Sequence, residues 1–89
     1  MKTEQTTLMA RDENGKLTET LTLTIYNNEL VNISWWDCEK KSHKVLNGTT
    51  NIIEGRKLFE DLSNLFVNWT TCKTIEKETS NTVRLWVRE

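Results

Sequence analysis

The segment from Thr20 to Tyr26 constrains the fold most, because its apolar and polar residues alternate without a break. In an extended chain Leu21, Leu23 and Ile25 fall on one face, and the threonines with Tyr26 fall on the other. Such alternation is typical of an antiparallel sheet that is covered on one face only. Threonine is β-branched and suits the uncovered side. The chain is therefore predicted to contain a sheet whose two faces differ in chemistry.

A hairpin is predicted directly after this strand. Residues 27–29 read Asn-Asn-Glu, and asparagine tolerates the left-handed conformation that tight hairpin turns require. A second alternating run then places Val31, Ile33 and Trp35 on the inward face. Upstream, residues 12–15 form another turn signal, so residues 6–11 are expected to be a first strand. The three strands would form an antiparallel meander.

An amphipathic helix is predicted to begin at Ile52. Asn51 followed by Glu54 has the spacing of a capping box, in which the asparagine side chain accepts a hydrogen bond from a free amide of the first turn. Over about seventeen residues, steps of 100° gather one apolar stripe, made of Gly55, Leu58, Phe59, Leu62, Leu65, Phe66 and Trp69. A glycine inside that stripe is best understood if the helix backbone approaches the sheet closely there.

The remaining segments complete an α+β prediction. The charged stretch 37–47 is expected to be a loop, and the alternation of Val83, Leu85 and Val87 predicts a last strand. A partner strand at about 72–77 has high β propensity but poor alternation. The predicted fold is thus a three-stranded antiparallel β-meander, one amphipathic helix, and one or two C-terminal strands. The helix would pack on one face of the sheet in a single domain, residues 1–89.

Adjacent tryptophans suggest where a partner would bind. In a strand only one of Trp35 and Trp36 can enter the core, so Trp36 is expected on the face opposite the helix. Tryptophan, tyrosine and arginine are enriched among interface anchors. The predicted partner-binding residues are Tyr26, Trp36, Trp86, Arg84 and Arg88, with the basic stretch Lys40, Lys41 and Lys44. The alternatives are that these rings lie far apart, that the 37–51 segment covers them, or that the lysines are only a solvated loop.

Two classes of partner compete for that face. A protein partner, either a host target or a second copy, would dock on the aromatic residues, and the net charge of −1 favours this class. Single-stranded nucleic acid would instead stack on the aromatic rings and contact the arginines and lysines through its phosphates. Small size, no proline and many Asn, Thr and Lys residues are associated with AT-rich bacteria and their phages. The expected function is a non-enzymatic accessory module that binds and modulates a host protein, such as a defence nuclease.

Catalysis, metals and cofactors find little support in the sequence. Cys38, His43 and Cys72 lack the paired spacing of structural zinc sites, and no cofactor motif occurs. Asp37, Glu39 and His43 are the only catalytic candidates, and we interpret them as solvent-exposed residues of a polar loop. Neither a signal peptide nor an apolar run of membrane-spanning length is recognised, so a cytoplasmic protein is expected.

Overall fold

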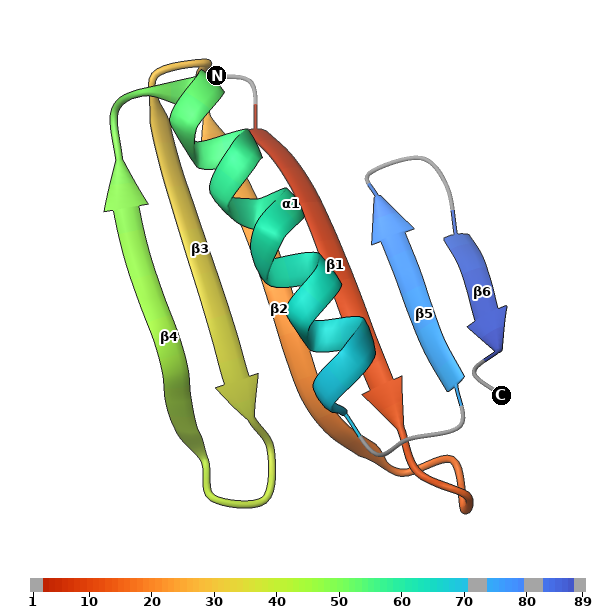
Figure 1. The fold of residues 1–89 in the computed structure, drawn as a ribbon. Helices are drawn as coiled ribbons and strands as arrows, with labels where there is room; N and C mark the ends of the chain where they lie inside the picture. Colours follow the sequence, from red (N-terminus) through yellow and green to blue (C-terminus); the bar gives the residue numbers. More distant parts are fainter. Residues whose placement is uncertain (1–2, 71–73, 80–82, 88–89) are drawn as a thin grey trace.

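The computed structural model describes residues 3–70, 74–79 and 83–87, the last of these as backbone only. In this part of the chain one helix lies against a six-stranded antiparallel sheet, as Figure 1 shows, which confirms the predicted α+β class. The strands are β1 (Thr3–Arg11), β2 (Leu17–Tyr26), β3 (Leu30–Asp37), β4 (Ser42–Thr49), β5 (Thr74–Thr79) and β6 (Val83–Val87); α1 (Ile52–Trp69) follows β4. Their order in the sheet is β4-β3-β2-β1-β5-β6.

Turn chemistry sets the register of the first strands. Asn27 and Asn28 have φ values of 51° and 57°, the left-handed conformation predicted for the turn between β2 and β3. In the turn before β2, the Asp12 carboxylate accepts hydrogen bonds from the amides of Asn14 and Lys16, each at 2.9 Å. Gly15 supplies the positive φ, 79°, that this turn needs. These short connections make consecutive strands direct neighbours in the sheet.

The prediction of a loop over residues 37–47 is wrong, because residues 42–49 form β4 at the edge of the sheet. Its side chains are exposed except for Val45 and Thr49, which are half-buried. The strand is held by its ladder with β3, in which Ser34 pairs with Leu46 and Trp35 with Val45. A strand that buries so little carries no hydrophobic periodicity, so the sequence pattern could not reveal it.

The helix begins where the cap predicted it. The Asn51 side chain accepts a hydrogen bond from the Glu54 amide at 3.1 Å, and α1 runs for 18 residues. Gly55 faces the sheet so closely that an added Cβ atom would lie 2.7 Å from Cγ1 of Val31 and 3.0 Å from its Cβ. The close approach inferred from this glycine is therefore present.

One apolar core lies between α1 and the sheet. It contains the buried apolar residues of the first three strands, from Leu8 to Trp35, together with Phe59, Leu62 and Phe66 of the helix and Ile75 of β5. Phe66 contacts Trp35 edge to face, with ring centroids 5.3 Å apart. The predicted helical stripe is only partly buried, because Leu65 and Trp69 at its C-terminal end are 40% and 72% exposed. The covered face of the sheet is thus the one that carries Leu21 and Trp35.

Candidate protein-interaction face

The opposite face of β1 to β4 carries no acidic residue or lysine, and its one arginine, Arg11 at the end of β1, is paired with Glu76 of β5. Strand pairing arranges its residues in rows, of which one runs through Thr7, Thr22, Ser34 and Leu46. We call this surface the neutral face; it comprises Thr3, Gln5, Thr7, Met9, Thr20, Thr22, Thr24, Tyr26, Leu30, Asn32, Ser34, Trp36, His43, Leu46 and Gly48. Within the described residues α1 is the helix that packs on the sheet, and it lies on the other side (Figure 1).

Trp36 occupies one end of the neutral face, as predicted from its position next to Trp35. It is half-buried and contacts the ring of His43 edge to face, with centroids 4.8 Å apart. His43 in turn lies with its Nδ1 atom 2.8 Å from the Ser34 hydroxyl. In the same row Trp36 pairs with Thr20, which pairs with Met9. The indole therefore packs against His43 on this face and stays partly accessible.

Tyr26 lies at the other end of the same face. It pairs with Leu30, whereas Trp36 pairs with Thr20, six residues away along β2. At about 3.3 Å per residue the two aromatic side chains are about 20 Å apart. Tyr26 and Leu30 are 41% and 46% exposed. The structure thus puts the predicted aromatic residues on one face without gathering them into one cluster.

Lys44 lies on the covered side of the sheet, away from Trp36. A register shift between Trp35 and Trp36 leaves Lys44 as an extra residue in β4, a β-bulge. Its ammonium group lies 2.6 Å from the Glu19 carboxylate and 5.8 Å from the centre of the Trp35 ring. The same carboxylate oxygen accepts a hydrogen bond from the Trp35 indole at 3.0 Å. The hydrogen bond with Glu19 raises the pKa of Lys44, so this lysine is held as a cation within the fold.

Lys40 and Lys41 lie in the turn between β3 and β4. Both are exposed, and Lys41 has a φ of 52°. The turn is organised by Asp37, whose carboxylate accepts hydrogen bonds from the amides of Glu39 and Lys40 at 3.0 and 3.1 Å. The hydrogen bond from the Lys40 amide lowers the pKa of Asp37 most. The two lysines are therefore at the end of the sheet, beside the neutral face but not within it.

The remaining predicted binding residues cannot be placed. Arg84 and Trp86 belong to β6, whose backbone pairs with β5, but their side chains lie outside the described residues. Arg88 lies outside the described residues altogether. Their assignment to the binding surface stays a prediction.

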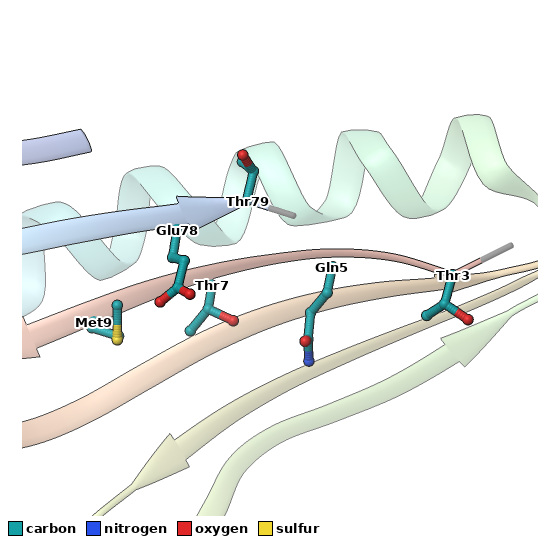
Figure 2. Close-up of a pocket in the computed structure, with 6 residues that line it drawn as sticks. All are labelled: Thr3, Gln5, Thr7, Met9, Glu78 and Thr79. Carbon is teal, nitrogen blue, oxygen red and sulfur yellow. The ribbon is translucent and has the colours of Figure 1, made fainter. Parts of the chain in front are cut away.

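A shallow hollow of about 460 Å³ marks the β1 side of the neutral face. Figure 2 shows most of its lining side chains pointing away from α1, while Thr79 points to the other side of the sheet. The lining residues are Thr3, Gln5, Thr7, Met9, Glu78 and Thr79. Glu78, which pairs with Thr7, is the first charged residue met beyond β1 at this level. The neutral face therefore ends at β5.

Sequence reasoning did not identify Leu46, Leu30 or Trp69 as an exposed apolar residue. Leu46 is 61% exposed on the neutral face, and its position could not be read while β4 was taken as a loop. Leu30 was missed as well, although the alternation of β3 already placed its side chain on the face of the sheet away from Val31. Trp69 was assigned to the apolar stripe but lines a second hollow of about 290 Å³ near Trp35 and Lys44. The end of α1 reaches past the part of the core that could bury this indole.

The chemical groups considered for catalysis do not converge. Asp37 is committed to the turn amides and Glu39 is exposed, whereas His43 interacts with Ser34 on the neutral face. Among the described residues no group of three or more His, Cys, Asp or Glu side chains is arranged to hold a metal ion. Cys38 is half-buried as a free thiol, and burial is the main cause that raises its pKa.

In the described part of the chain, α1 lacks the combination of length and apolar character that crossing a bilayer demands. No protein-family model matches the chain, and neither the curated proteins nor the solved structures contain a match to it.

Proposed function

We propose that this chain is a small non-enzymatic interaction module that binds another protein through the neutral face. The observation that carries the proposal is the composition of this face. On this face four adjacent strands present no acidic residue or lysine, and their one arginine, Arg11, is paired with Glu76. The same face exposes Tyr26, Leu30 and Leu46 and carries Trp36, which packs against His43. The centres of protein interfaces are depleted of charged residues and enriched in aromatic ones, which matches this composition.

The neutral face suits a protein better than single-stranded nucleic acid. Nucleic-acid grooves combine stacking rings with cations that contact the phosphates. Here Trp36 and Lys44 lie on opposite sides of the sheet, and Lys44 is paired with Glu19. Lys40 and Lys41 are at the end of the sheet. A nucleic-acid function would therefore depend on Arg84 and Arg88, whose side chains are outside the described residues, and we keep it as the second candidate.

The partner is proposed to be a host protein or a second copy of the chain. The host hypothesis, in which a phage or mobile-element accessory protein modulates or inhibits a target such as a defence nuclease, rests on composition alone. Its support is the absence of proline, the small size and the abundance of Asn, Thr and Lys. The neutral face adds a place where such a target would dock.

A pair of tryptophan variants tests this function. Trp36→Ala removes the indole of the neutral face, and Trp69→Ala removes a 72% exposed indole from the other side of the molecule. We expect Trp36→Ala to weaken the dissociation constant for a captured host protein about thirtyfold, the size of a hot-spot loss, and Trp69→Ala to leave it unchanged. Circular dichroism controls for folding. Equal binding by both variants would remove the neutral face as the docking surface.

Fluorescence titration with single-stranded oligonucleotides at low and high salt tests the second candidate. Stacking on tryptophan should quench its emission, and phosphate contacts should make the quenching weaker as salt rises. A salt-sensitive response would favour nucleic acid over the protein partner proposed here.

A further inference from the structure

We propose that the partner that fits the neutral face is a second copy of this chain, so that two sheets stack face to face in a homodimer. This inference rests on the proposed function, because it names the occupant of the same surface. Three properties of the neutral face argue for it: charge, hydrogen-bonding character and area.

Charge is the first requirement for self-association. When two identical faces dock about a two-fold axis, each side chain of one copy lies near side chains of the same face of the other copy. A face with several charges of one sign would then repel itself. The neutral face avoids this cost, since the charged side chains that β1 to β5 carry on this side are Arg11 at the end of β1 and Glu76 and Glu78 of β5, all at its border. Glu76 is also paired with Arg11 at 3.0 Å.

The polar groups of the neutral face are complementary to themselves. Its hydroxyl and amide side chains, from threonine, serine, asparagine and glutamine, can each donate and accept a hydrogen bond. The chain already contains one such pair, because the hydroxyls of Thr7 and Thr22 lie 3.3 Å apart and either one can donate. A lysine or an aspartate surface could not pair with its own copy in this way. Docking of a second copy would therefore leave fewer polar groups of the neutral face without a hydrogen bond than docking of a surface that can only donate or only accept.

The area of the sheet opposite α1 is comparable to one side of a standard interface. The two longer dimensions of the molecule, 38 and 26 Å, set an upper limit of about 1,000 Å² on the uncovered side of the six-stranded sheet, and the neutral face occupies four of its strands. A standard interface buries about 800 Å² on each partner. Exposed Tyr26, Leu30 and Leu46, together with Trp36, supply apolar area at both ends and at the β4 edge of this surface. Face-to-face packing of two such sheets would produce a sandwich with layers about 10 Å apart.

Opposite charges placed at the centre of the face provide the test. Thr22 lies in a middle row on β2 and is half-buried. Analytical ultracentrifugation should find the wild-type chain as a dimer, and Thr22→Arg and Thr22→Glu each as a monomer, because like charges would meet across the two-fold axis. An equimolar mixture of the two variants should recover the dimer mass, since the opposite charges then attract. Misfolding of either variant cannot produce this recovery.

The control places the same charge on the other side of the molecule. Asn64→Arg adds the same charge to an exposed position of α1 and should leave the dimer intact. A wild-type chain that is monomeric at every concentration would overturn the inference, as would a dimer that neither Thr22 variant dissociates or that the mixture does not restore. A monomer that still captures another protein in a Trp36-dependent manner would overturn the dimer alone and leave the proposed function standing. A chain that neither dimerises nor binds another protein through Trp36 would overturn the proposed function as well.

Discussion

The two faces of β2 and β3 belong to the same strands but differ in burial. On the covered face, Leu21, Ile33 and Trp35 are at most 5% exposed and pack against α1. On the neutral face, one residue away in each strand, Thr22 and Ser34 are half-buried and have no element of the described chain packed over them. Burial specifies size and shape closely, whereas a polar sheet surface tolerates many residues. The stability of the fold should thus reside on one face, which leaves the other available for binding.

The largest effect is expected from Phe66→Ala compared with Trp69→Ala. Phe66 is fully buried against Trp35, so its truncation should lower the free energy of unfolding by about 3–5 kcal/mol. Trp69 is larger but mostly exposed, and its truncation should change stability by less than about 0.5 kcal/mol. Urea unfolding measures both values. Similar losses for the two variants would break the distinction between a stabilising core and the exposed end of the helix.

A smaller effect is expected from adding a methyl group to two glycines. In Gly55→Ala the new Cβ would collide with buried Val31, and the overpacking should outweigh the gain of about 1 kcal/mol in helix propensity. A net loss of about 1 kcal/mol should result. In Gly48→Ala, on the neutral face, the nearest atom is the Val31 carbonyl oxygen at 3.7 Å, so little change is expected. Thermal unfolding of the pair makes the comparison, and a stabilised Gly55→Ala would show that the helix does not press on the sheet at Val31.

The smallest effect concerns the ion pair at the rim of the covered face. Glu19→Gln keeps an acceptor for the Trp35 indole but removes the charge that raises the pKa of Lys44. Because the Lys44 side chain is 47% exposed, the loss at neutral pH should stay below about 1 kcal/mol. A raised lysine pKa stabilises the fold below its unfolded value of 10.5, and this stabilisation is lost as the pH rises through the higher folded value. Urea unfolding at neutral and strongly alkaline pH should show the difference between variant and wild type disappearing. A difference independent of pH would assign it to packing instead.

Strands that bury one face could be predicted from sequence, and the edge strand could not. Alternation located the inward residues of β2 and β3, and Asn51 located the start of α1, because each signal is local. β4 buries too little to show a period and exists because β3 offers it a hydrogen-bonding edge. The positions of Trp69 and Lys44 were missed for a related reason. The exposure of Trp69 depends on where the core ends along α1. The side on which Lys44 lies depends on the bulge opposite Trp35.

The sequence by itself determined that this chain has a sheet with one apolar and one polar side, a helix that covers the apolar side, and a tryptophan at position 36 facing away from it. These properties follow from periods of two and 3.6 residues, which are encoded locally. Only the tertiary structure decided that Tyr26 and Trp36 lie at opposite ends of the neutral face, and that Lys44 lies on the other side of the sheet. Strand order, register and bulges arise from pairing between distant segments, and no local pattern records them.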